Sequence, residues 1–470
     1  MRYTYQDYLE VLDTGSETQM IQFVLNAINS HKQSDEYETA VLADEYFRHR
    51  NRTIVLYQKL LYTVSGKVVK DNFSANFKMA SNFLFQFTVQ LNQYLLGNGV
   101  SWGSSGTEKK LGKNFDTMLQ KAGKEALVGG VSFGFMNFDH LEVYNIREYV
   151  PLYDEENGAL CAGIRFWQYA KNKPLRAILY DLDGYTGFMW KDGLGSVYTP
   201  KQPYKVKVRT TAFDGSEILD GENYPTFPFV PFYGINKQSE LVGRQEQIDC
   251  YDLIKSGFAN TVDEASLIYW TITGAGGMKS DVDLVKFVER IKTVHAASLG
   301  DGQTAESHAV ETPFQSREAL LTRLRDDLYE DFMAMDYKNV ASGSVVTAQI
   351  DAAFANIDLK ADDFEYNVID FLQGILAVLG IEDDPTFTRN KIVNAQEQIT
   401  TLLQAAQYLD SEYITRKILE LLGDGDLAEE ILKRIDAEDL ERINLQPNEP
   451  AEDEEGDENG APGDEAGEEG

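Results

Sequence analysis

Two long helical stretches separated by residues 271–313 constrain the fold of this chain more than any other feature. In residues 239–268, and again from residue 316, apolar side chains recur every three or four positions, the spacing of one buried helix face. A helix of about 30 residues is about 45 Å long. If the two stretches pair antiparallel, the residues between them form an insert at the far end of a helical hairpin.

The chain before the first long helix changes character. Residues 1–62, 77–96 and 108–127 carry helical patterns. In residues 131–235, β-branched and aromatic residues alternate with polar ones and are interrupted by turn signals, which predicts an antiparallel sheet. The sheet region closes with residues 227–232, whose two prolines predict an extended segment at a sheet edge.

The chain after the second long helix is again mostly helical. A polar break covers residues 336–345, and a helix is predicted over residues 345–380. Residues 389–444 have the pattern of a compact helical unit. The tail, residues 447–470, consists mainly of Glu, Asp, Gly, Pro and Ala, which predicts disorder. The fold class predicted from this order is α+β.

The charge of the chain argues against tight binding of nucleic acid. Its 76 acidic and 43 basic side chains give a net charge of -33, and the tail accounts for 11 of the acidic ones. The part that folds is therefore acidic as well. DNA binders present basic patches that neutralise phosphates. A protein with this charge is expected to let DNA slide past rather than hold it.

Cysteine content and hydropathy bear on the cellular compartment and on membrane insertion. Cys161 and Cys250 show no pairing pattern, which favours a reducing compartment. The N-terminus lacks the apolar stretch of a signal peptide. Residues 79–107 carry no charge, but Asn and Gln recur on one helical face, so we interpret them as a helix packed on protein rather than a membrane span.

Motifs for cofactors and metals are weak. Lys279-Ser280 follows a glycine cluster, yet Met278 breaks the spacing of a phosphate-binding loop, so a flexible turn is the better interpretation. The five histidines are scattered and form no metal-binding pair. We therefore expect no cofactor, no metal and no catalytic site.

Adjacent carboxylates leave one enzymatic alternative open. The pairs Asp326-Asp327 and Asp362-Asp363 would suit acid–base chemistry, as in an acidic hydrolase. In a chain with 76 acidic residues such pairs arise by chance, so a solvated surface is the simpler interpretation.

Several short segments occur in an order typical of one protein family. They include Ile-Asp-Cys-Tyr-Asp at residues 248–252 and Ser-Gly-Phe-Ala-Asn at residues 256–260. The full series is residues 95–100, 125–134, 149–154, 162–167, 229–241, 248–252 and 256–260. Over about residues 40–445 the chain resembles the portal proteins of siphovirus-type tailed bacteriophages.

The resemblance implies a portal-type subunit with a mixed wing, a long-helix stem, a small α/β clip insert and a helical crown. The implied boundaries are N-terminal helices and wing sheet 1–238, stem helices 239–270 and 314–335, clip 271–313, tunnel loop 336–345, wing helix 346–388, crown 389–446 and a disordered acidic tail 447–470.

The resemblance also implies a function. Such a subunit forms a homo-oligomeric ring of twelve at one capsid vertex, through which double-stranded DNA passes in packaging and ejection. Its implied partners are terminase, a head-completion or neck protein, the scaffold and the major capsid protein, with no membrane involved. It would reside in the virion, and in the host cytoplasm during assembly. A phage structural adaptor without a channel is the alternative.

Two sets of residues are the candidate functional positions under this interpretation. A tunnel loop would repeat its charge around the ring axis, and its candidate DNA-facing residues are Lys338, Asn339, Val340, Ser342 and Ser344. The clip would meet partner proteins, and its candidate partner-facing residues are Lys279, Lys286, Arg290 and Lys292.

Overall fold

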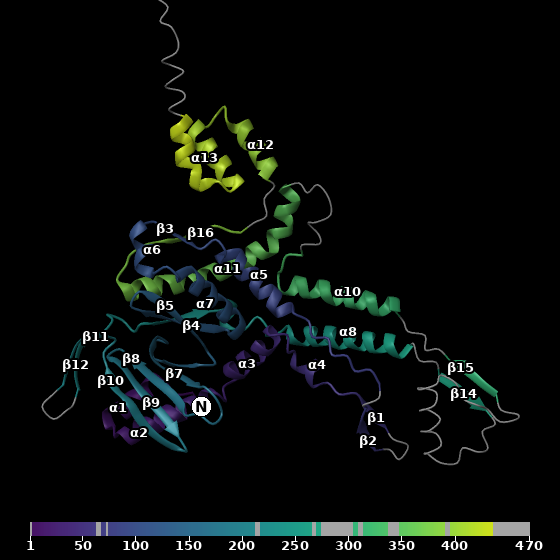
Figure 1. Cartoon of the computed structure of the whole chain (residues 1–470), viewed down its shortest axis with the longest axis horizontal. Helices are drawn as coiled ribbons and strands as arrows, with labels where there is room; N and C mark the ends of the chain where they lie inside the picture. The colour runs from purple at the N-terminus through teal and green to yellow at the C-terminus, as the bar shows by residue number, and fades with distance from the viewer. Residues whose placement is uncertain are drawn as a thin grey trace, which may run out of the picture. The chain divides into compact units, whose positions relative to one another are not determined.

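The computed structural model of the chain (Figure 1) describes its helices and strands in two compact units. The first unit contains Met1–Gly343 and Asp351–Lys391, and the second contains Ser344–Ile350 and Ile392–Gly470. The residues described are 2–62, 67–71, 74–211, 217–265, 269–273, 304–308, 314–336, 347–390 and 395–435.

The N-terminal part is helical, as the sequence predicts. Its helices are α1 (Tyr5–Thr14), α2 (Glu17–His31), α3 (Asp35–Phe47) and α4 (Arg52–Leu56). The first three begin at a hydroxyl side chain that accepts a hydrogen bond from a backbone amide of the first turn. These caps satisfy amides that have no partner within the helix. A short hairpin of β1 (Leu60–Tyr62) and β2 (Val68–Lys70) follows α4.

The sheet region is antiparallel throughout its described strands. One sheet has the order β10-β9-β8-β7-β6, a second has the order β13-β4-β5, and β11 pairs with β12. β13 lies at the edge of its sheet, as the two prolines of residues 227–232 predict. The strands are β4 (Val131–Asn137), β5 (His140–Asn145), β6 (Tyr149–Tyr153), β7 (Leu160–Gln168), β8 (Leu175–Asp181), β9 (Gly184–Lys191), β10 (Leu194–Gln202), β11 (Lys205–Thr211), β12 (Glu217–Glu222) and β13 (Phe229–Tyr233).

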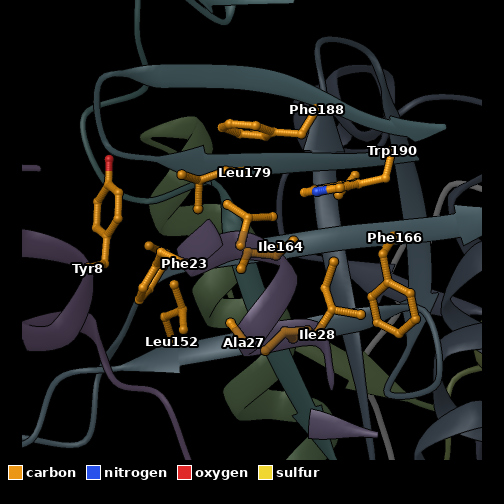
Figure 2. Packing of buried hydrophobic residues seen from close by; sticks show 14 residues of the cluster. Tyr8, Phe23, Ala27, Ile28, Leu152, Ile164, Phe166, Leu179, Phe188 and Trp190 are labelled. Carbon is orange, nitrogen blue, oxygen red and sulfur yellow. The ribbon is translucent and has the colours of Figure 1, made fainter. Parts of the chain in front are cut away.

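Helices α1 and α2 cover one face of the five-stranded sheet. Phe23 and Ile28 of α2 face Ile164 of β7 and Phe188 and Trp190 of β9 (Figure 2). The residues of β7 alternate between this cluster and the other face, as the period of a strand requires. This packing joins the first helices of the chain to strands more than a hundred residues away.

The helix predicted over residues 108–127 is divided in two. The structure has α6 (Ser105–Leu111) and α7 (Phe115–Gly129) instead. Gly112 separates them with a φ of 87°, and a Cβ atom there would lie 2.1 Å from the carbonyl oxygen of Asp139. Only glycine fits that backbone, so the prediction of one helix was wrong.

The long helices are present but differ in their bounds. The structure has α8 (Gln245–Ala265), α10 (Phe314–Asp331) and α11 (Thr347–Leu379). The first starts later than residue 239, because residues 240–244 form consecutive turns. Among the described residues, no helix combines the length and apolar character needed to cross a membrane.

The remaining elements are short. Strand β14 (Tyr269–Thr273) pairs with β15 (Thr304–His308) and begins at residue 269, so the prediction of a helix as far as residue 270 was wrong there. After α11, β16 (Pro385–Phe387) pairs with β3 (Val100–Trp102), and η1 (Ile235–Lys237) precedes α8. The described part of the second unit contains α12 (Ala395–Ala405), α13 (Ser411–Leu422) and η3 (Gly425–Leu427), in agreement with the predicted helical unit.

Candidate functional site: the helical hairpin and its base

Helices α8 and α10 pair antiparallel. Near the insert, the rings of Phe258 and Phe314 lie 5.6 Å apart. At the other end, Arg244 just before α8 donates from Nε to the carbonyl oxygen of Asp331, at 3.0 Å. The two strands β14 and β15 follow α8 and precede α10, with Tyr269 paired opposite His308. The chain therefore leaves and re-enters the hairpin at one end.

A buried ion pair lies where the hairpin meets α11. Lys360 of α11 donates from Nζ to Glu240 Oε2 at 2.6 Å and to the carbonyl oxygen of Phe332 at 2.8 Å. Both charged side chains are about 95% shielded from solvent. Arg244 lies 3.4 Å from the same carboxylate and stacks over the Phe332 ring. Three segments far apart in the sequence are thus joined through the ammonium group of Lys360.

Burial makes this pair sensitive to its surroundings. Desolvation lowers the pKa of Lys360, and the neighbouring Glu240 carboxylate opposes that shift. An ammonium group so buried is stable only when it is paired and hydrogen-bonded. The three segments are therefore expected to move together rather than independently.

Glutamine side chains of α5 (Phe83–Leu96) form hydrogen bonds with the end of α10 and with the residues that follow it. Gln90 donates from Nε2 to the Met335 carbonyl oxygen at 2.9 Å, and its Oε1 accepts from the Met335 amide at 3.1 Å. Gln86 donates to the Tyr329 hydroxyl at 2.8 Å. The two hydrogen bonds of Gln90 therefore fix the backbone at Met335, immediately before the polar break.

An extended segment, residues 77–81, runs along α8 and is bonded to it by three side chains. The amides of Phe77, Met79 and Ser81 donate to acceptors on one helix face. In the same order these acceptors are Asn260 Oδ1 at 2.7 Å, Ser256 Oγ at 2.9 Å and Asp252 Oδ1 at 2.9 Å. We call this segment the strap.

The spacing of the strap contacts follows from backbone geometry. Alternate residues of an extended chain are about 6.6 Å apart. Side chains four residues apart on a helix are separated by about 6 Å along its axis. Every second strap amide therefore meets every fourth residue of α8, and the two elements stay in register.

The strap corrects the prediction that a helix begins at residue 77. The structure starts α5 at Phe83 instead, because the amides of residues 77, 79 and 81 bond to α8. A helical backbone would turn those donors inward. The helical pattern in the sequence does not reveal this competition, since the acceptors lie 171 to 183 residues further along the chain.

Asp252 is the most enclosed of the strap acceptors. Its side chain is fully buried and also accepts a hydrogen bond from the side-chain Nδ2 of Asn51. The same Nδ2 donates to the Ser81 carbonyl oxygen. Burial raises the pKa of Asp252, and these hydrogen bonds partly offset the rise. Asp252 therefore joins α8, the strap and the start of α4.

The residues that sequence reasoning named as functional positions lie outside the described part of the chain. This holds for the tunnel-loop candidates Lys338, Asn339, Val340, Ser342 and Ser344. It also holds for the clip candidates Lys279, Lys286, Arg290 and Lys292. The structure describes the segments on either side of both regions.

The adjacent carboxylates lie on helix surfaces, and three of the four pair with arginines. Asp326 contacts Arg325 at 3.1 Å, and Asp327 contacts Arg323 at 3.2 Å. Asp362 accepts from Arg389 at 2.8 Å. Across the described ranges, no cluster of three or more His, Cys, Asp or Glu side chains is arranged to hold a metal ion. The geometry thus favours the solvated-surface interpretation over a shared acid–base site.

The features above define a class: an α+β subunit in which a long antiparallel helical hairpin carries an insert and is fixed at its base to a third helix. Residues 28–444 match the family described as phage portal protein, SPP1 Gp6-like, and the chain belongs to this family.

The similar proteins are distant. A portal protein of Clostridium phage phiCD119 is 25% identical over 204 residues, which are 41% of this chain and 45% of that relative. The chain therefore matches less than half of the relative's length. Two solved structures are similar at 10% identity, each covering 72% of this chain and 89% of the other. They are the virion of a native gene transfer agent particle (TM-score 0.40) and the neck of the native particle computed with C12 symmetry (TM-score 0.38).

Sequence reasoning missed part of the site and found part of it without its role. Asp252, Ser256 and Asn260 belong to two of the segments that carry the resemblance to portal proteins, and the structure shows them to be the strap acceptors. Glu240 lies in another of these segments, residues 229–241, whereas Lys360 carries no comparable signal. The position of Lys360 between apolar residues of a predicted helix is the one sign in the sequence that its charge is buried.

Proposed function

We propose that this chain is a portal subunit that forms a ring of twelve copies at one capsid vertex and conducts double-stranded DNA in packaging and ejection. The family match over residues 28–444 carries this proposal. The net charge of -33 supports passage of DNA without tight binding, because a surface of like charge does not retain phosphates. The subunit would act structurally, in the virion and before that in the assembling particle in the host cytoplasm.

The parts of the fold suggest their roles in such a ring. The sheets and N-terminal helices, residues 1–238, would be the wing, and residues 239–270 and 314–335 the stem. The insert 271–313 would be the clip that meets terminase and later a head-completion or neck protein. Residues 346–388 would be the wing helix and residues 389–446 the crown, with scaffold and major capsid protein as further partners.

Residues 336–345 would be the tunnel loop that faces DNA. The geometry around Met335 supports this, because Gln90 fixes the backbone at the point where the segment begins. A loop that contacts a moving polymer needs such a fixed start. Lys338, Asn339, Val340, Ser342 and Ser344 would be the side chains repeated around the channel.

The mass of the purified protein tests the ring. We expect light scattering to give about twelve times the 52.9 kDa subunit mass, and negative-stain images to show a central hole. A monomer at high concentration would contradict the ring and favour an adaptor that binds protein without forming a channel.

Bulky replacements test the tunnel loop. We expect Asn339→Trp or Val340→Trp to impair DNA packaging severely, since they narrow a channel at every copy in the ring. Ring assembly should be unchanged, because the loop would not form the contacts between subunits. Packaging at the wild-type level would refute the assignment of residues 336–345. The matched control is Tyr366→Trp, at an exposed site on α11.

A further inference from the structure

Exposed apolar side chains are concentrated in residues 55–79. Large apolar side chains on the surface are ordinary when they occur singly, but a cluster of them marks an interaction site. Leu56 is 68% exposed, Leu60 55% and Phe77 54%. The full set is Val55, Leu56, Tyr57, Leu60, Val68, Val69, Phe77 and Met79. We call these eight residues the apolar arm.

The apolar arm is held together by contacts between its segments. Lys78 of the strap donates from Nζ to the carbonyl oxygen of Val55 in α4, at 2.6 Å. The Asp71 amide donates to the Lys59 carbonyl oxygen at 2.9 Å, which continues the pairing of β1 with β2. Helix α4 in turn contacts α8, beside which it lies in Figure 1. The arm is thus built on the hairpin and the strap.

The charge around the apolar arm is opposite to that of the chain. Residues 51–80 contain five basic residues and a single acidic one, Asp71, whose side chain is buried. Lys67, Lys70 and Lys78 are exposed. In a chain with a net charge of -33, the exposed apolar residues of the arm are therefore accompanied by exposed lysines, which we call its basic rim.

We propose that the apolar arm docks onto a second copy of this chain. Each copy is strongly acidic, so a basic rim is attracted to another copy wherever its own acidic surface is exposed. Burial of large aliphatic and aromatic side chains against protein supplies the affinity, at about 25 cal/mol per Å² of apolar surface. The inference rests on the proposed ring and specifies which surface each subunit uses to build it.

The contact would be heterologous, joining the arm of one subunit to a different face of the next. Contacts of that kind close into a ring when the rotation between subunits is right. A phosphate surface, in DNA or an anionic membrane, would engage the lysines. If DNA bound there, the apolar residues that dominate the arm would stay exposed. DNA binding therefore accounts for fewer residues of the arm than docking onto a protein does.

Charge and polarity changes on the arm test the inference in the full-length protein. The variant combines Leu56→Glu, Val68→Glu and Lys70→Glu, all at exposed sites whose changes should leave the fold intact. The matched control combines Lys191→Glu and Leu194→Glu, at exposed sites of the β9–β10 hairpin. Sedimentation velocity over a concentration series would give the concentration at half-assembly, and circular dichroism would check folding.

We expect the arm variant to raise the half-assembly concentration at least about tenfold, as loss of a central interface contact does, and the control to leave it unchanged. If the arm variant fails to fold, Lys67→Glu with Lys70→Glu is the milder substitute. Assembly of a folded arm variant at the wild-type concentration would overturn the inference.

Other outcomes separate the inference from the proposed function. A wild-type protein that never assembles would refute the ring, and with it the reason to invoke a second copy. Binding of wild-type protein to phosphatidylglycerol vesicles or to a DNA fragment, abolished in the arm variant while assembly persists, would show that the arm meets a different partner and that the inference is wrong.

Discussion

Replacing Lys360 by Met should lower the free energy of unfolding by about 3 kcal/mol, because the change leaves the carboxylate of Glu240 buried without its main partner. Arg244, 3.4 Å from the same carboxylate, can compensate only in part. The Phe332 carbonyl oxygen also loses a donor. Urea unfolding at matched protein concentration would measure the effect, since assembly itself adds stability.

A double replacement distinguishes the buried charge from lost packing. Combining Lys360→Met with Glu240→Gln removes both charges, and we expect it to recover most of the lost stability. Arg323→Met is the control, because its pair with Asp327 lies on the surface and should contribute less than about 1 kcal/mol. A Lys360→Met variant as stable as the wild type would show that the ion pair does not hold the base of the hairpin.

Replacing Asp252 by Ala should cost about 2 to 3 kcal/mol, since it leaves two buried donors unpaired. These are the backbone amide of Ser81 and one of the two N–H groups of the Asn51 side-chain amide, whose other N–H donates to the Ser81 carbonyl oxygen. The strap should then loosen, so the amides of residues 77–81 should exchange hydrogen faster than in the wild type. Hydrogen exchange by mass spectrometry would detect this locally. Asp363→Ala, at an exposed site of α11, is the control and should alter stability by less than about 0.5 kcal/mol.

The same site gives a dependence on pH with a defined sign. Burial raises the pKa of Asp252 in the folded state, so folding favours its protonated form. Its contribution to stability is therefore greatest below the ordinary pKa of an aspartate and declines as the pH rises through the folded pKa. Asp252→Asn should remove that part of the pH profile. An identical profile in this variant would contradict the assignment.

Much of the fold follows from patterns within short stretches of sequence. The periodicity of three and four predicts α8, α10 and α11, and alternation with turn signals predicts the antiparallel strands. The wrong predictions fall where a distant partner competes with the local pattern. Residues 77–81 fit a helix by pattern, yet α8 captures their amides. Gly112 divides one predicted helix because the chain near Asp139 leaves room only for glycine.

The types of secondary structure, their order, the acidic charge and the motifs shared with portal proteins can be read from the sequence, since they depend on neighbouring residues and composition. The tertiary structure alone shows that Lys360 meets Glu240, that side chains of α8 accept hydrogen bonds from the strap amides, and that the apolar arm is exposed. The first two of these features join positions 120 or more residues apart, and no periodicity within a helix or a strand encodes such a pairing. Burial and hydrogen bonding across the folded chain select it.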